Sequence, residues 1–215
     1  MANLRVDCLE LGLVQTNTYI VWNADTLECI VIDPSDGFEQ IEQRITEKHL
    51  QPAAVYITHG HDDHIGSVNE LKRRYHVLVY ILKEEEEFVE SVQYNLSMAF
   101  GHPRVVEPDM FFIDGQEVSV LGSKVQVLHT PGHTVGGCCY YFPEEKMVFT
   151  GDTLFCESVG RSDLPGGDGA QLIASVREKL MPLPDDVSVC PGHGPLSSIG
   201  HERKYNYFLM QDAGL

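Results

Sequence analysis

A dense group of possible metal ligands lies between residues 58 and 64, where the sequence reads Thr-His-Gly-His-Asp-Asp-His. Imidazole nitrogens and carboxylate oxygens are the groups that bind divalent transition metals in proteins. His59 and His61 are two positions apart, so in an extended chain both imidazoles point to the same side. Asp63 and His64 follow at once and can point toward a second position. The stretch therefore favours a pair of divalent ions over a single ion.

Three later motifs supply further candidate ligands. His133 follows the apolar run 125–128, Asp152 follows 147–150, and His193 follows 187–190. Glycine or proline stands beside each of these ligands, and such residues let the backbone bend sharply near a crowded ion pair. Four motifs of this kind, each at the end of a strand-like segment, indicate a metal centre held by a rigid scaffold.

In these motifs the chain resembles hydrolases of the metallo-β-lactamase fold, and especially compact proteins similar to glyoxalase II (hydroxyacylglutathione hydrolase). The pattern T-H-x-H-x-D-H at 58–64 is typical of that whole superfamily. Pro-Gly-His-Thr at 131–134, Thr-Gly-Asp-Thr at 150–153 and Gly-Arg-Ser-Asp at 160–163 resemble the glyoxalase II and persulfide dioxygenase branches. The resemblance extends from about residue 17 to His193 and the tail.

The resemblance implies seven ligands for two divalent ions, with zinc expected and iron or a mixed zinc and iron pair as alternatives. Three ligands belong to the first ion, three to the second, and the last bridges both: His59, His61, His133; Asp63, His64, His193; and Asp152.

The resemblance further implies a metal-dependent hydrolase that cleaves a small thioester such as S-D-lactoylglutathione. A metal-bridging hydroxide would be the nucleophile, because metal binding strongly lowers the pKa of water. The departing thiolate has affinity for borderline-soft metals such as zinc. Asp63 and Asp152 are the candidate catalytic residues through the ions they bind, and Asp63 can also orient the attacking water.

Two other functions stay open. One is an oxidoreductase similar to persulfide dioxygenases, which use one iron at the first site. The other is a non-catalytic binding protein that retains the fold, although a complete ligand set argues against it. Oxygen uptake with glutathione persulfide would separate the oxidoreductase from the hydrolase.

Several residues outside the ligand set could serve either the site or the local structure. Arg161 can clamp a substrate carboxylate, or it can pair with a nearby aspartate and brace its own loop. Thr58 and Asp33 stand where they could orient the histidines, although local turn bonding explains them equally well. His129 is outside the ligand pattern, and we expect a structural role for it.

The composition is that of one globular domain, here 1–215, with 43% hydrophobic and 22% charged residues. A net charge of −17 argues against a nucleic-acid partner. The partner that the resemblance implies is a small-molecule thioester. The sequence has neither an apolar run long enough for a membrane helix nor an apolar signal core at its start, so we expect a cytoplasmic protein. The six cysteines show no C-x-x-C spacing and are expected to be buried, reduced thiols.

Periodicity predicts strands and helices that alternate along both halves of the chain. By themselves they indicate α/β or α+β; the resemblance implies an α+β fold, the four-layer αβ/βα sandwich. Expected helices span 38–48, 65–75 and 170–179, and expected strands span 5–11, 18–22, 29–32, 54–57, 77–81, 117–121, 125–129, 137–142, 147–150 and 187–190.

The insert at 83–112 differs from the rest in character. The acidic run 83–92 predicts a helix with a solvated face. The more apolar segment 94–102 is expected either to form a wall or lid over the metals or to pack into the core. Longer glyoxalase II enzymes hold glutathione with basic residues of a C-terminal helical region, whereas only 194–215 follow His193 here, so the thiol of the substrate stays open.

Overall fold

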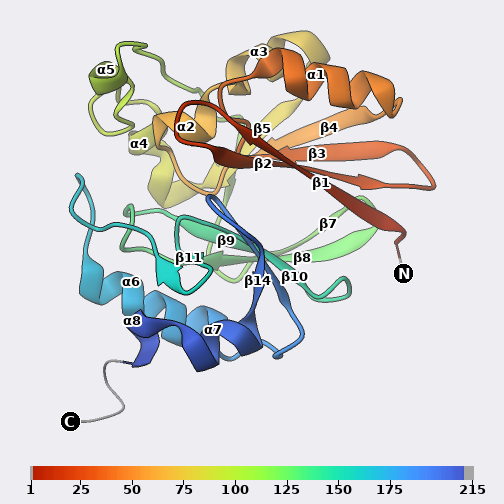
Figure 1. Ribbon diagram of the computed structural model, residues 1–215. Coiled ribbons are helices and arrows are strands. Elements are labelled where there is room, and N and C mark those ends of the chain that lie inside the picture. The colour runs from red at the N-terminus through yellow and green to blue at the C-terminus, as the bar shows by residue number, and fades with distance from the viewer. Residues whose placement is uncertain (1, 211–215) are drawn as a thin grey trace.

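Two six-stranded β-sheets lie face to face, and helices cover the outer face of each (Figure 1). The computed structural model describes residues 2–210. The order of layers is helices, sheet, sheet, helices, and this confirms the expected α+β sandwich of the metallo-β-lactamase type. Within the described residues, no helix combines the length and apolar character that crossing a membrane requires.

The first sheet is built from the N-terminal half of the chain in simple sequence order. Its first three strands pair antiparallel and the later ones pair parallel. Its strands are β1 Leu4–Leu11, β2 Thr16–Asn23, β3 Glu28–Ile32, β4 Gln51–Tyr56, β5 Leu78–Leu82 and β6 Met110–Phe112. Helices α1 (Phe38–Glu47) and α3 (Val68–Tyr75) cover its outer face, because each presents an apolar stripe to the sheet.

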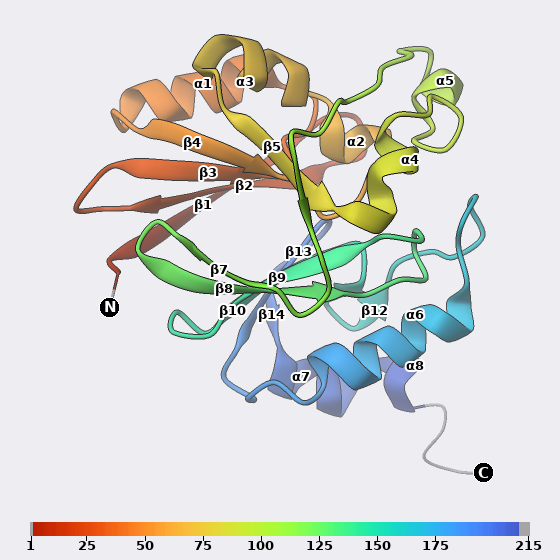
Figure 2. The ribbon, with the colours of Figure 1, turned by 180° about the vertical axis from the view of Figure 1, so that it is seen from behind.

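The second sheet has the order β14-β13-β10-β9-β8-β7. Its strands are β7 Glu117–Val120, β8 Ser123–His129, β9 Cys138–Phe142, β10 Met147–Gly151, β13 Ser188–Pro191 and β14 Ser197–Ser198. A small hairpin of β11 (Leu154–Phe155) and β12 (Ser158–Val159) follows β10. Figure 2 shows the covering helices on the outer side of this sheet: α6 Gly169–Ser175 with its π-helical continuation η2 Val176–Leu180, α7 Ile199–Tyr205 and α8 Tyr207–Met210.

Aromatic rings fill the space between the two sheets. Tyr56 of the first sheet packs against Tyr140 of the second with ring centroids 5.2 Å apart. Tyr140 also donates its hydroxyl to the Ile57 carbonyl at 2.7 Å, and Tyr19 donates to the Pro191 carbonyl at 2.7 Å. Buried hydroxyls therefore tie the sheets together at the strand ends that lead into the ligand motifs.

Most elements appear where periodicity predicted them, and the differences have local causes. The helix expected over 65–75 is broken into α2 (Asp62–Ile65) and α3. A Cβ atom at Gly66 would lie 2.4 Å from the Asp36 nitrogen, so the chain turns there around a neighbouring backbone. Strands β6, β11, β12 and β14 were missed, because runs of two or three residues carry almost no periodic signal.

The acidic helix expected over 83–92 is shorter than predicted and consists of two consecutive helical pieces, and a third short helix lies within 94–102. These three elements are η1 Lys83–Glu85, α4 Glu86–Val89 and α5 Ser97–Phe100. The expected solvated face is wrong for Glu85, whose side chain is fully buried. The insert packs on the ligand loop, since the Asp62 N–H donates to the Asn95 carbonyl at 2.7 Å.

All six cysteines are free, and four of them are buried as expected. The expectation is wrong for Cys8, which is exposed on β1, and for Cys156, which is half-buried in the turn of the β11–β12 hairpin. Strand β1 lies at the edge of its sheet, where only one neighbour covers it.

Candidate metal centre

The ligand motifs of the sequence meet at one end of the two facing sheets, in the segments that follow β4, β8, β10 and β13. His59 and His61 stand in the loop after β4, and His61 is extended at φ −65° and ψ 147° as it leads into α2. Asp63 and His64 belong to α2 itself. The change from extended chain to helix separates the first two candidate ligands from the next two, so the two pairs belong to different groups of side chains.

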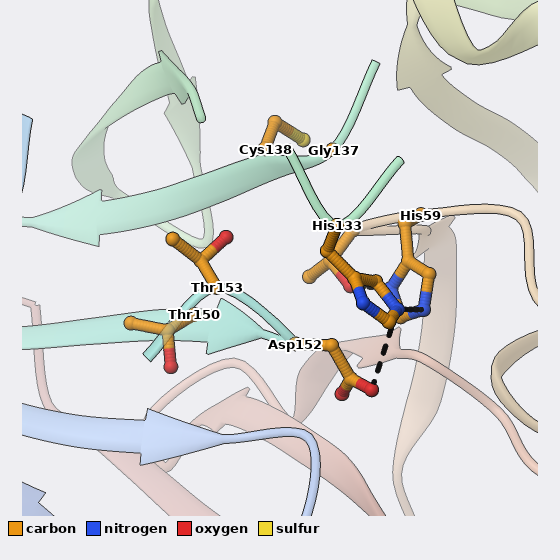
Figure 3. Close-up of a pocket in the computed structure, with 8 residues that line it drawn as sticks. His59, His133, Gly137, Cys138, Thr150, Asp152 and Thr153 are labelled. Carbon is orange, nitrogen blue, oxygen red and sulfur yellow. Dashed lines mark hydrogen bonds and ion pairs between the residues drawn. The ribbon is translucent and has the colours of Figure 1, made fainter. Parts of the chain in front are cut away.

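The first group is formed by His59, His61 and His133, all nearly buried. The Nε2 atom of His133 lies 2.9 Å from Nδ1 of His61 and 3.2 Å from Nε2 of His59. Figure 3 shows the rings of His59 and His133 turned toward the same point. Ligand atoms about 2.0–2.1 Å from a tetrahedral zinc ion are about 3.3 Å from one another, so this spacing suits one ion.

The second group is formed by Asp63, His64 and His193. Oδ2 of Asp63 lies 3.3 Å from Nε2 of His64 and 3.2 Å from Nε2 of His193. These separations are again those of ligands around a single ion. The second group comes from α2 and from the loop after β13, one element from each sheet's half of the chain.

Asp152 lies between the two groups. Its Oδ2 is 3.5 Å from Nε2 of His133 and 3.6 Å from Nε2 of His193, and its Oδ1 is 3.3 Å from Nε2 of His64. Within residues 2–210, Oδ1 of Asp152 and Nε2 of His64 are buried and have no hydrogen-bond partner. Buried polar atoms without partners are costly, and bound divalent ions would satisfy both of them, so the donor set fits such ions.

Asp33 holds the second group from behind. Its Oδ2 lies 3.0 Å from Nδ1 of His64 and accepts the Thr58 hydroxyl at 2.6 Å, while its Oδ1 accepts the Thr58 N–H at 2.7 Å. The Thr58 hydroxyl is also 3.2 Å from Nδ1 of His59. Asp33 and Thr58 thus contact the ring nitrogens that point away from the candidate ions, an arrangement that fixes imidazole orientation.

Two further contacts position the ligands. The Arg161 carbonyl lies 2.7 Å from Nδ1 of His133, and the Thr16 hydroxyl donates to Oδ2 of Asp63 at 2.7 Å. Glycine is needed at Gly192, because a Cβ atom there would lie 2.3 Å from Oδ1 of Asp152. The backbone before His193 therefore approaches Asp152 as closely as sterics permit.

Burial and charge set the protonation states of the centre. Burial lowers the pKa of His59 well below its usual range and that of His61 to about 3, so both rings are neutral, as ligands must be. Burial opposes ionisation of Asp63, but His64 and the hydrogen bonds from His193 and Thr16 hold its pKa below the ordinary value. Neutral imidazoles and ionised carboxylates are the forms that bind metal. Burial lowers the pKa of His64, but Asp63 and Asp152 outweigh it and hold that pKa well above the usual range, so this ring must lose a proton to bind metal.

A cavity of about 520 Å³ opens onto the centre and is bordered by five of the candidate ligands. Its other walls come from the β1–β2 turn, the segment that ends in α5, β11 and the loop before α6: Val14, Leu96, Ala99, Phe100, Phe155, Arg161 and Leu164. Of the two expectations for the segment 94–102, the wall over the centre is therefore the one found.

The structure also shows the contacts of the residues that the sequence analysis placed outside the ligand set. The Arg161 side chain lines the cavity, and its guanidinium donates to both carboxylate oxygens of Asp163 at 2.7 and 2.8 Å. Nε2 of His129 contacts the Val135 carbonyl at 2.9 Å, which is the structural role expected for it. Glu85 was missed as a residue of the site's surroundings, since a glutamate within an acidic run carries no signal of burial.

The chain matches known proteins over nearly its whole length. Residues 11–193 match the family model described as the metallo-beta-lactamase superfamily. The chain is 35% identical over 209 residues to hydroxyacylglutathione hydrolase GloC of Haemophilus influenzae, covering 96% of this chain and 98% of that protein. The crystal structure of BLEG-1 B3 metallo-beta-lactamase superposes with a TM-score of 0.90 at 36% identity, over 95% of this chain and 99% of that one. The crystal structure of TTHA1623 in a di-iron-bound form superposes with a TM-score of 0.85 at 36% identity, over 94% of this chain and 100% of that one.

Proposed function

The chain belongs to the metallo-beta-lactamase superfamily, and from that premise we propose that it is a hydrolase that cleaves small thioesters with the help of two metal ions. One observation carries the proposal: seven donor side chains lie together, and Asp152 is close to His133 of one group of three and to His64 and His193 of the other. Asp152 also forms an overlapping group with His59 and His64. A carboxylate within 3.6 Å of histidines in both groups is suited to bridge two cations.

We assign His59, His61 and His133 to one ion and Asp63, His64 and His193 to the other, with Asp152 as the bridge. Zinc suits this mixture of nitrogen and oxygen ligands, and iron or a mixed pair suits it as well. Divalent ions bound there would polarise a carbonyl group and lower the pKa of a water molecule to near neutrality.

The walls of the cavity support water as the nucleophile. Among the described residues that line the cavity there is no serine, cysteine, threonine or lysine. The other residues of the centre therefore serve to orient the metal ligands. Asp33 and Thr58 fix the imidazole rings, and Thr16 fixes the carboxylate of Asp63. Hydrolysis of a thioester releases a carboxylic acid and a thiol, both small enough to leave a cavity of this size.

S-D-lactoylglutathione is the first substrate to test, because a relative at 35% identity is named hydroxyacylglutathione hydrolase. Protein of known metal content, from elemental analysis, is mixed with the thioester and thiol release is followed. We expect about two metals per chain and activity that a chelator abolishes. A fully loaded protein that cleaves no thioester, but takes up oxygen with glutathione persulfide, would replace the hydrolase by an iron-dependent oxidoreductase.

A further inference from the structure

We propose that the cavity above the metal centre selects thioesters whose acyl and thiol parts are apolar and carry no negative charge. This inference rests on the proposed thioester hydrolysis, R–CO–S–R′ plus water giving R–COOH and R′–SH. It concerns the walls of the cavity, which decide which R and R′ are bound.

Apolar side chains make up the walls beyond the candidate ligands. They come from four separate segments of the chain: Val14, Leu96, Ala99, Phe100, Phe155 and Leu164. Phe155 also packs its ring against His193, with centroids 5.9 Å apart. A substrate bound at the metals would therefore have an apolar surface on several sides.

Apolar side chains also stand at the mouth of the cavity, beside Asp36, Asp62 and His102. Val14 and Phe100 both border a second, smaller cavity, so the β1–β2 turn and α5 lie next to each other at the rim. Phe100 is 49% exposed and Val14 is 45% exposed, and their neighbours Met98 and Leu13 are 53% and 95% exposed. Large apolar side chains gathered at a pocket mouth gain free energy when a ligand covers them.

Charges of the cavity wall do not favour an anionic thiol. Apart from the candidate metal ligands, Arg161 is the one charged side chain among the described lining residues, and its guanidinium is paired with both oxygens of Asp163 in an exposed ion pair. The chain as a whole carries a net charge of −17, which two divalent ions at the centre would reduce but not reverse. Glutathione has two carboxylates, and no unpaired cation of the wall stands ready to receive either of them.

Matched substrates test the proposal without changing the acyl group. S-D-lactoylglutathione and its diethyl ester share the acyl group and differ only at the two glutathione carboxylates, which are charged in one and capped by ethyl groups in the other. We expect kcat/KM to be about tenfold or more higher for the diester, mainly through a lower KM, because the ester groups remove charge and add apolar surface. Replacing lactoyl by butyryl on N-acetylcysteamine should likewise lower KM.

Phe100 provides the matching variant. Phe100→Ser should raise KM for the diester and the butyryl thioester several-fold and leave kcat nearly unchanged. Phe208→Ser is the control, since Phe208 is also a surface phenylalanine, 40% exposed, but lies on α8 beyond the second sheet. Binding of S-butyl-N-acetylcysteamine, a thioether that cannot be hydrolysed, to metal-free protein gives a readout independent of catalysis, and only Phe100→Ser should weaken it.

The outcomes separate this inference from the proposed function. Hydrolysis of S-D-lactoylglutathione with equal or higher kcat/KM than its diester would overturn the apolar selectivity and leave the thioesterase intact. Equal effects of the two serine variants would also overturn it. Fully metallated protein that cleaves none of these thioesters would reject the proposed function, and the selectivity with it.

Discussion

The carboxyl group of Glu85 accepts a hydrogen bond from the N–H of Gly60 at 2.8 Å, between the two candidate ligands His59 and His61. Its other oxygen accepts the Gly136 N–H at 2.7 Å, in the loop that follows His133. A single fully buried side chain from the insert thus ties together the ligand loops of both sheets.

Replacing this carboxyl group should destabilise the fold. Glu85→Gln leaves an amide NH₂ facing one of the two backbone N–H groups, so one buried donor loses its acceptor. We expect the free energy of unfolding to fall by about 1–3 kcal/mol, measured by urea denaturation of the metal-free protein. Glu84→Gln, at an exposed neighbouring position, is the control and should change little. Equal effects of the two variants would contradict the bridge.

The same residue predicts a pH dependence of stability. Burial raises the pKa of Glu85 from its ordinary 4.5 to about 8, against the hydrogen bonds from Gly60 and Gly136. Between these two values the folded state binds the proton more strongly than the unfolded state, so this contribution is complete below about 4.5 and is lost as the pH rises through about 8. The difference in unfolding free energy between the native protein and Glu85→Gln should therefore change over this range, and a constant difference would refute the shift.

Metal content should distinguish the bridging carboxylate from a carboxylate of one site. Asp152→Ala removes contacts with both groups, whereas Asp63→Ala removes contacts with the second group alone, besides that with the Thr16 hydroxyl. We expect Asp152→Ala to lower the content of both ions and Asp63→Ala to lower that of one. Elemental analysis after equal dialysis measures this, and loss of a single ion in each variant would remove Asp152 from the bridging position.

Asp33 should act through His64. In Asp33→Asn an amide would replace one of the oxygens that face Thr58 and Nδ1 of His64, so the ring would lose its orientation. Changes of this kind cost about 10–100-fold in metal affinity, and we expect the loss at the second ion alone. Competition with a chromogenic chelator reports it. Asp25→Asn, a surface change beside Asn3, should bind both ions normally.

Freeing Arg161 should favour an anionic substrate. The Arg161–Asp163 pair is exposed, with side chains 61% and 69% accessible, so breaking it costs little. In Asp163→Asn the guanidinium becomes available, and KM for S-D-lactoylglutathione should fall several-fold while KM for its diethyl ester stays constant. Asp186→Asn changes the net charge equally at an exposed pair with Lys146, so a matching fall in that variant would point to overall charge instead.

Local sequence was sufficient to single out the candidate ligands of the loop after β4. His59, His61, Asp63 and His64 are neighbours in the chain, so their residue types and spacing alone indicated a metal loop after a strand. Most strands and helices could be predicted for the same reason, since periodicity of two or of 3.6 residues is a local property. A predicted helix is interrupted where backbone from another part of the chain packs against it, as Asp36 does at Gly66.

Long-range contacts decided the rest. The separation of Asp152 from His64 and from His193, the burial of Glu85 beneath two ligand loops and the pairing of Arg161 all depend on how the two sheets face each other. The apolar wall likewise joins segments as distant as Val14 and Leu164. The sequence shows which side chains are chemically able to bind metal or substrate. Packing between residues far apart in the chain decides which of these side chains are buried, form hydrogen bonds or line a cavity.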